Sequence, residues 1–233
     1  MAISYVAGTS FVTANWETSV EGSLNVGSNA GRFILGFFGH HGSDAAADIA
    51  ASDITYASSS TGVTLGTLVT FNSGSNEKWR PFYIAVPGGT TGSNTLKVND
   101  PDNVGRKLVL IAAAYDGVSA VSTAGNETFP YDYTNNPFAT VTSATGEEVV
   151  ALIYNYDING ATLTASSPAT LLTGLNPSNA DMWGLRQDGA SGNVNIDGTF
   201  PGSNAWLAWG FSLTPSSSQS QAPRSMHQLR LRR

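Results

Sequence analysis

Apolar residues along the chain fall in short runs, and glycine, asparagine and aspartate separate these runs. In the clearest run, Ala205–Leu213, every second residue is apolar, and Trp209 and Phe211 are among them. Side chains alternate between the two faces of a strand, so a spacing of two predicts a strand with one face against a core. Three further runs have the length of buried strands: Arg32–Phe38, Lys107–Tyr115 and Glu148–Tyr156.

Many shorter segments of the same kind fill the chain up to Pro215, whereas helix signals are nearly missing. Short strands separated by turn residues are typical of a sandwich. We therefore predict an all-β fold, a two-sheet antiparallel β-sandwich of the jelly-roll type, as one domain over residues 1–215. Pro81 has no backbone N–H to donate, so we expect its strand at a sheet edge or at a bulge.

The composition is typical of a rigid β-protein with a neutral polar surface. Hydrophobic residues make up 41% of the chain and charged residues only 12%, which is about half of the usual charged share. The chain has no cysteine, so disulfides and thiolate metal sites are excluded. The first residues lack a basic start and a long apolar stretch, and the longest apolar run is too short to span a bilayer. We expect no signal peptide and no membrane partner.

Residues 216–233 differ from the rest of the chain in charge and composition. They contain four of the eleven basic residues, Arg224, Arg230, Arg232 and Arg233, and no acidic residue, so their formal charge is +4. The preceding residues hold seven basic and seventeen acidic side chains, a formal charge of −10. A segment rich in serine and glutamine cannot bury enough apolar surface to fold alone. The sequence therefore predicts an extended basic C-terminal arm.

This arm carries the residues that we expect to bind a partner. Leucine and arginine alternate from Leu229 to Arg232 as in a strand, so the segment can add to a sheet edge of a neighbouring protein. Its arginines would then pair with carboxylates of that neighbour. The net charge of −6 and the lack of aromatic residues between the arginines argue against nucleic acid as the partner. The expected partner-binding residues are Arg224, Met226, His227, Leu229, Arg230, Leu231, Arg232 and Arg233.

The segment HHGSD, which begins at His40 and contains Ser43, brings imidazole, hydroxyl and carboxylate groups together in the sequence. A hydrolase triad needs these groups to converge through space beside an oxyanion site, which five consecutive residues rarely achieve. The chain has no GxSxG motif, and its third histidine, His227, lies in the arm. We expect a polar loop at this segment and no enzyme activity.

Acidic residues offer two further candidates for chemistry. Three loops present oxygen atoms for calcium, Asp100–Asn103, Asp157–Gly160 and Asn193–Gly198, but none has the closing glutamate of an EF-hand. Aspartate and asparagine beside glycine or proline also form ordinary turns. Glu147 and Glu148 are adjacent at a strand start, so we expect solvated side chains on opposite faces, which cannot flank a glycosidic bond. We predict no catalytic residue, no metal and no cofactor.

The order of several segments resembles a known module. Between Arg32 and Pro215 the chain contains WRPFYIAVPGGTTGSNTLKV, RKLVLIAAAYDGV, VTSATGEEVVALI and NAWLAWGFSLTP. These segments resemble a β-sandwich module that is common in phage virion proteins and in bacterial surface proteins. The resemblance implies a fold and a setting, and it brings no catalytic set of residues with it.

A copy of this module without a signal peptide and with a basic arm resembles a phage capsid cement (decoration) protein. That resemblance implies a structural protein, made in the host cytoplasm, that binds the outer surface of the major capsid protein shell and stabilises it. It also implies a homotrimer on the exterior of the virion. The alternative is a carbohydrate-binding module, or the head domain of an adhesin or tail fibre, with Trp16, Trp79, Tyr131 and Tyr133 stacked on a glycan.

Overall fold

The computed structural model describes residues 2–13, 17–41, 48–72, 76–101, 107–122, 134–155, 162–173, 175, 182–202 and 206–216. Strands dominate these residues, and one short 3-10 turn, η1 (Ala51–Asp53), interrupts them. The strands are β1 (Ser4–Val12), β2 (Ser19–Asn25), β3 (Phe33–His41), β4 (Ile54–Tyr56), β5 (Val63–Leu65), β6 (Val69–Asn72), β7 (Asn76–Ala85), β8 (Ser93–Asn99), β9 (Lys107–Asp116), β10 (Val118–Ser122), β11 (Phe138–Ser143), β12 (Glu148–Asn155), β13 (Thr164–Ala165), β14 (Thr170–Leu171), β15 (Met182–Asp188), β16 (Gly192–Thr199) and β17 (Trp206–Pro215).

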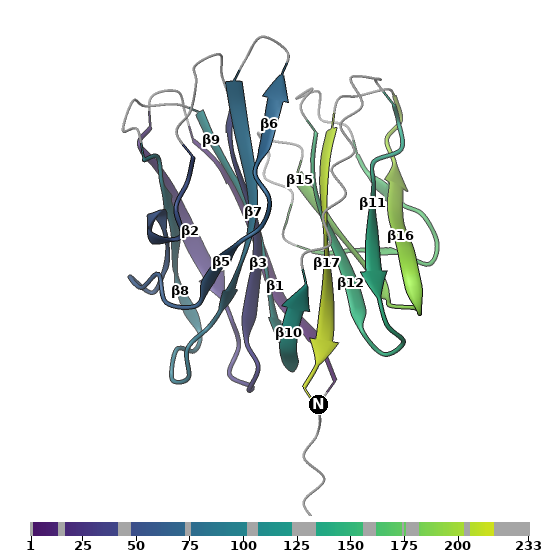
Figure 1. Ribbon diagram of the computed structural model, residues 1–233, viewed down its shortest axis with the longest axis horizontal. Coiled ribbons are helices and arrows are strands. Elements are labelled where there is room, and N and C mark those ends of the chain that lie inside the picture. Colours follow the sequence, from purple (N-terminus) through teal and green to yellow (C-terminus); the bar gives the residue numbers. More distant parts are fainter. Residues whose placement is uncertain are drawn as a thin grey trace, which may run out of the picture.

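The strands form four antiparallel sheets that lie one against the next as layers (Figure 1). An outer sheet, β2-β8-β4, packs on an inner sheet of order β1-β9-β3-β7-β5, in which β6 also pairs with β7. The second inner sheet, β10-β17-β12-β15-β14, packs on the first, and β11-β16-β13 forms the other outer layer. The predicted all-β sandwich is confirmed, with four sheets among the described residues where two were expected.

Four sheets arise because the chain winds the same sandwich twice. In the first half the order β1-β9-β3-β7 faces β2-β8-β4, and in the second half β10-β17-β12-β15 faces β11-β16-β13. When the strands of the two halves are matched in chain order, from β1 with β10 to β9 with β17, each strand has the same neighbours in its sheet as its counterpart. Only β6 has no counterpart among the described residues. Two facing sheets wound in this way make a jelly roll. We call β1–β9 the first roll and β10–β17 the second roll.

Matching irregularities show which residues of the two rolls correspond. In the first roll Tyr5 lies opposite Tyr115, and a β-bulge follows directly in β1. In the second roll Val118 lies opposite Pro215, and a β-bulge follows directly in β10. Tyr115 therefore corresponds to Pro215, and residues 107–115 of β9 correspond to the residues of β17 whose numbers are higher by 100.

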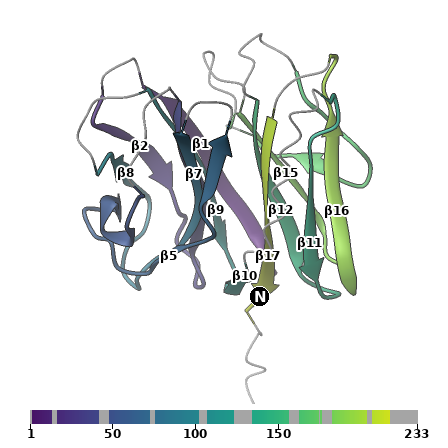
Figure 2. The ribbon, with the colours of Figure 1, turned by 45° about the horizontal axis from the view of Figure 1, so that its top comes forward.

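Both rolls begin and end at the same end of the molecule. Gly117 joins them with a φ of +72°, and a Cβ at this position would lie 2.2 Å from the Ala2 carbonyl oxygen. Only glycine fits such a backbone without strain. The N–H of Ser216 donates to the Gly117 carbonyl at 2.7 Å. The start of the chain, the joint between the rolls and the end of β17 thus meet in one place, at the lower end of Figure 2.

Aromatic side chains from both rolls pack together in the central core, the apolar cluster between the two inner sheets. Trp79 of the first roll stacks on Tyr154 of the second, with ring centroids 4.6 Å apart. Phe37 of the first roll lies 5.3 Å from Trp79 and 6.3 Å from Trp209 of the second. Because both rolls supply this core, the described residues pack as one unit.

The strand β17 is buried on both faces, although the alternation of its residues predicts one buried face. Leu207 and Trp209 face the central core, whereas Trp206 and Ala208 face the outer core of the second roll. The alternation itself is real, but a further sheet covers the second face. The sequence of one strand gives no sign of such a layer.

Pro81 lies in β7, which is an interior strand, so the expectation of an edge position is wrong. It lies opposite Phe37 of β3 on one side. On the other side of β7, the pairing with β5 ends at Phe82 and the pairing with β6 begins at Trp79. Pro81 therefore lies opposite the gap between these two short strands. Its carbonyl still accepts a hydrogen bond from the N–H of Gly66 at 2.9 Å. The missing N–H of the proline coincides with a break in the neighbouring strand.

Candidate functional site

The root of the predicted arm is fixed at the joint between the two rolls. The N–H of Ser216 donates to Gly117, and Ser119 Oγ donates to the carbonyls of Thr214 and Pro215 at 3.2 and 3.1 Å. The chain therefore leaves the body from a defined point. The predicted partner-binding residues lie outside the described residues: Arg224, Met226, His227, Leu229, Arg230, Leu231, Arg232 and Arg233.

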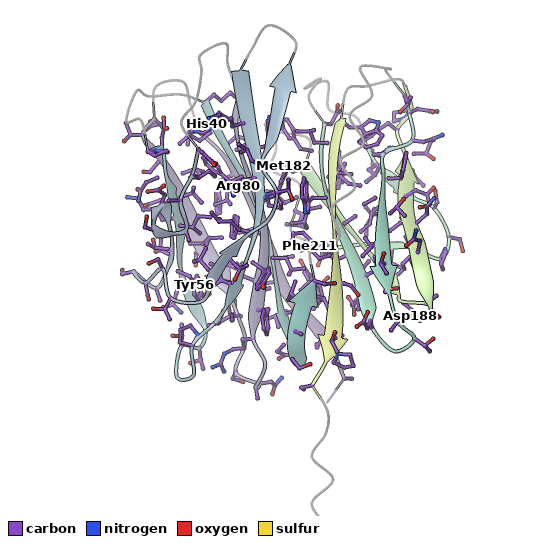
Figure 3. All side chains as sticks on the ribbon, in the orientation of Figure 1. His40, Tyr56, Arg80, Met182, Asp188 and Phe211 are labelled. Carbon is purple, nitrogen blue, oxygen red and sulfur yellow. The ribbon has the colours of Figure 1, made fainter. Side chains whose placement is uncertain are left out.

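His40 lies in the core of the first roll, so the expectation of a polar loop at this residue is wrong (Figure 3). Its Nε2 lies 3.4 Å from Asp100 Oδ1, and the two side chains are 1% and 0% exposed. The edge of the imidazole also meets the Phe38 ring, with centroids 5.1 Å apart. Ser43, which supplies the hydroxyl of this segment, lies outside the described residues. The pairing of His40 with Asp100 has no signal in the sequence, because the two residues belong to distant segments.

Glu147 binds two hydroxyl groups at the end of β17. Its Oε2 accepts a hydrogen bond from Ser212 Oγ and its Oε1 accepts one from Thr214 Oγ1, both at 2.7 Å. The N–H of Ala144 also donates to Oε2 at 2.8 Å. The Ser212 hydroxyl, followed by the other two donors, lowers the pKa of Glu147. This carboxylate is engaged in holding a turn and two strands together.

Glu148 points to the other face of β12, toward the first roll. Its Oε1 lies 4.0 Å from Arg186 Nη1, and the buried Tyr115 hydroxyl is also beside it. Burial raises the pKa of Glu148, although Arg186 and Tyr115 oppose this shift. The two glutamates do lie on opposite faces, as predicted, but neither is a freely solvated end residue.

The acidic loops supply no metal centre within the parts of the chain that the structure covers. Asp100 is buried beside His40, and residues 102–106 and 156–161 lie outside the described residues. In the third loop, Asn193 and Asn195 are strand residues of β16 that accept hydrogen bonds from threonines of β11. No group of three or more His, Asp or Glu side chains in the described ranges is placed to hold an ion.

The aromatic residues proposed to stack on a glycan do not form a surface platform in the described part of the chain. Trp79 is fully buried in the central core, so its assignment as a stacking residue is wrong. Trp16, Tyr131 and Tyr133 lie outside the described residues. Phe138 packs against Trp206 with ring centroids 5.8 Å apart.

The two outer sheets present neutral polar surfaces with few charges. On the second roll, Thr140 donates to Asn195 Oδ1 at 2.6 Å and Thr142 donates to Asn193 Oδ1 at 2.9 Å. On the first roll, Lys97 Nζ lies 3.4 Å from Glu21 Oε2. On both outer sheets these polar side chains are engaged with one another.

Comparisons with known proteins leave the resemblance to cement proteins as a prediction. No protein-family model and no curated protein sequence matches the chain. A search of solved structures finds A223, a turret protein of Sulfolobus turreted icosahedral virus, at 13% identity over 91% of this chain and 99% of that chain. The TM-score of 0.19 is too low for the match to carry an argument. Across the described residues, no helix is long and apolar enough to cross a membrane.

Proposed function

We propose that the chain is a structural virion protein, a capsid cement (decoration) protein that binds the outer surface of a shell of major capsid protein and stabilises it. The observation that carries this proposal is the fixed root of a basic arm on a body that assembles no reactive site among its described residues. The sequence resemblance to cement proteins points the same way.

The body favours binding over catalysis because its candidate reactive groups are used to build the fold. His40 is buried in a core, Glu147 holds two hydroxyls of β17, and Trp79 is stacked between aromatic rings. General acid–base groups must reach a substrate within hydrogen-bond distance. His40, which is sealed inside the protein, does not meet this requirement, and the carboxylate of Glu147 is occupied by the hydroxyls of β17.

The arm provides a second point of attachment. From its root at Ser216, the 18 residues 216–233 reach about 60 Å when extended, which is enough to cross onto a neighbouring subunit. Each exposed arginine–carboxylate pair contributes about 0.2–1 kcal/mol. A tethered second contact raises the effective concentration of the first, so body and arm together bind about 100-fold or more tighter than either alone.

The position of the root also gives the body an orientation in this proposal. The arm leaves from the end where both rolls begin and end, so that end faces the shell. In a homotrimer three arms would extend from three such ends and clamp three neighbouring subunits. The trimer is tested by native mass spectrometry of the full chain.

The test measures binding to shells assembled from the major capsid protein of the same virus. We compare the full chain, a chain ending at Ser216, and two full-length variants in which all four arm arginines become glutamine or lysine. We expect truncation to weaken binding about 100-fold or more and to lower the melting temperature of the shell. The lysine variant should retain most binding, and the glutamine variant should resemble the truncation.

Unchanged shell binding and shell stability after truncation would overturn the role of the arm. A glycan array, probed with the full chain and no shell, tests the alternative of a carbohydrate-binding module. Glycan binding that survives truncation at Ser216, together with no affinity for shells, would replace the cement proposal by that alternative.

A further inference from the structure

The outer sheet of the second roll has a short open edge at the start of β16. In this sheet β16 lies between β11 and β13, and the Asp197 carbonyl accepts a hydrogen bond from the N–H of Ser166, which directly follows β13. Backbone groups along an antiparallel strand point to alternate sides, so those of Asn193 and Asn195 point away from β11, like those of Asp197. β13 pairs only with the last two residues of β16. Both asparagines are exposed, so this edge faces solvent.

A side chain from the neighbouring sheet covers part of this edge. Gln187 of β15 donates from Nε2 to the Asn195 carbonyl at 2.9 Å. In the described part of the chain, no strand pairs with β16 beside Asn193 and Asn195. A side-chain amide leaves such a carbonyl by rotation, whereas a paired strand must break several backbone bonds. The edge is therefore able to take up a strand from another chain.

The main chain covers the same place in the first roll. β8 is the counterpart of β16, and a glycine with positive φ, Gly92 or Gly192, occurs where each strand begins. When these glycines are matched, residue numbers differ by 100 and the exposed and buried positions of the two strands largely coincide. Asn195 thus corresponds to Thr95, whose carbonyl accepts a hydrogen bond from the N–H of Ala57 at 3.1 Å. One roll covers this carbonyl with backbone and the other with a side chain.

The covering residue itself replaces an aromatic ring. Ser212 corresponds to Ala112 by the offset of 100. From Ser212 the register leads across Val149 to Gln187, and from Ala112 the same two steps lead to Phe82. Phe82 is fully buried in the outer core of the first roll. The second roll thus has an amide that reaches the edge of β16 where the first has a core ring.

Charges beside the open edge favour a basic strand. Asp197 follows Asn195 on the same face of β16, and its counterpart in the first roll is Lys97, which pairs with Glu21. Residues 118–215 contain eight acidic and one basic side chain, a formal charge of −7, whereas residues 1–117 contain nine and six, a charge of −3. An arm with a charge of +4 is therefore attracted more strongly to the second roll than to the first.

We propose that residues 229–232 of one copy add as a strand to the edge of β16 at Asn193 and Asn195 in a second copy, where they displace the amide of Gln187. This inference rests on the proposed function, in which the arm crosses onto a neighbouring subunit, and it names a second copy of the chain as that subunit. The arm supplies backbone N–H and C=O groups to those of the two asparagines, and each such bond contributes about 0.5–1.5 kcal/mol.

The side chains of the arm fit the two faces of this edge. Leucine and arginine alternate in residues 229–232, so they fall on opposite faces of an added strand. The leucines then cover the rim of the outer core beside Val194, which is a core residue of β16. The arginines lie on the outer face, where Asp197 is within reach as a diagonal neighbour.

The arm and the open edge belong to the same end of the body. Asp188 is the last residue of β15, and the turn after it leads to Gly192 at the start of β16. In the orientation shared by Figures 1 and 3, Asp188 lies toward the end at which the N-terminus and the arm root meet. The 13 residues from Ser216 to Leu229 span about 43 Å when extended. Such an arm reaches a copy that stands alongside, and the same contact repeated from copy to copy closes a ring.

The test is hydrogen exchange, measured residue by residue without any shell. A ¹⁵N-labelled chain ending at Ser216 is mixed with an excess of the unlabelled full chain, so that only an arm from another copy reaches the labelled edge. We expect the amides of Asn193 and Asn195 to exchange about tenfold more slowly in the mixture. Their counterparts Ser93 and Thr95 should not change. Unchanged exchange at both asparagines over a series of full-chain concentrations would overturn the inference.

A charge reversal at the edge tests the position of the arginines. Asp197→Lys in the labelled chain places the residue of the first roll in the second, and it should raise the concentration of full chain needed for protection about fivefold or more. Lys97→Asp is the matched control and should leave that concentration unchanged. Equal effects of the two variants would contradict docking at this edge.

The outcome for this inference is separable from the outcome for the proposed function. If the arm is required for shell binding while Asn193 and Asn195 stay unprotected, the proposed function stands and the inference is wrong. If both amides are protected but the full chain does not bind shells, the inference stands and the proposed function is wrong.

Discussion

In the outer core of the first roll, aromatic rings lie over glycines, whereas in the second roll aromatic rings lie against one another. A Cβ added to Gly36 would lie 2.1 Å from the Phe82 ring. In the second roll, Trp183 meets Phe200 edge-on, with ring centroids 5.1 Å apart. The same strand order therefore accepts two ways of filling the space between its sheets. We expect the first roll to be sensitive to added volume and the second to lost volume.

The largest effect is expected where the two rolls share a core. Trp79→Ala removes a ring that stacks on Tyr154 of the other roll, and truncation of a buried tryptophan costs about 3–5 kcal/mol. We expect the free energy of unfolding measured in urea to fall by this amount, and the rate of hydrogen exchange to rise in both rolls. Trp183→Ala is the matched control, because Trp183 lies in the outer core of the second roll. If Trp79→Ala loosened the first roll alone, the rolls would be separate units.

Added volume tests the glycine–aromatic packing of the first roll. Gly36→Ala places a methyl group against Phe82, and such overpacking costs about 1–3 kcal/mol. Gly88→Ala is the control, since a Cβ at Gly88 meets no atom within 4 Å. We expect a clear loss of unfolding free energy for the first variant and a change near zero for the second. Equal effects would show that the ring moves aside freely.

Glu147 gives a pH-dependent effect at the end of the second roll. The pKa of Glu147 is lowered in the folded protein. Its contribution to the free energy of unfolding is therefore present above its unfolded pKa and is lost as the pH falls through the folded pKa. Glu147→Gln should lower the unfolding free energy by about 1 kcal/mol at pH 7. The difference from the unaltered chain should vanish once the pH has fallen below the folded pKa of Glu147. A difference that is constant with pH would contradict this account.

The adjacent Glu148 should respond with the opposite sign. Burial raises its pKa, so its stabilising form is the neutral one, which is present at acidic pH and lost as the pH rises through the folded value. Glu148→Gln mimics the neutral form, and we expect it to raise the free energy of unfolding by less than about 1 kcal/mol at pH 7. The gain should shrink at acidic pH. A loss at pH 7 would show that the Arg186 contact dominates.

The smallest effects are expected on the two outer sheets. Lys97→Ala removes an exposed ion pair with Glu21, which contributes about 0.2–1 kcal/mol and less at high salt. Thr142→Ala removes a neutral hydrogen bond to Asn193 of similar size. When thermal unfolding is measured in low and in high salt, high salt should reduce only the destabilisation caused by Lys97→Ala. An equal salt dependence would remove this distinction between the two surfaces.

Sequence patterns identified the strands that are apolar and long. The predicted strand at Lys107–Tyr115 is β9, and β12 is the described part of the strand predicted at Glu148–Tyr156. The strand β2 was missed because its sequence, SVEGSLN, is mostly polar, and because Gly22 leaves its inner face to the Phe11 ring. Packing of this kind fills a core with a side chain from another strand, and local periodicity does not report it.

The doubling of the jelly roll was invisible in the sequence for a related reason. Corresponding positions have chemically different side chains, as His40 and Ile153 show, while the backbone winding is the same. Residue type at a buried position must match its neighbours in volume and hydrogen bonding, and different sets of neighbours satisfy this equally well. The candidate arm was found from charge and composition alone, and its residues after Ser216 lie outside the described residues.

The meeting of Ala2, Gly117 and Ser216 makes the order of the two rolls along the chain interchangeable. A chain reconnected from the end of β17 to the start of β1, and opened at Gly117, would present the second roll first and keep every strand in its sheet. For protein engineering, the same geometry means that cargo fused just before Ala2 or directly after Ser216 would emerge at one end of the body. The opposite end, where His40 lies, would stay unencumbered.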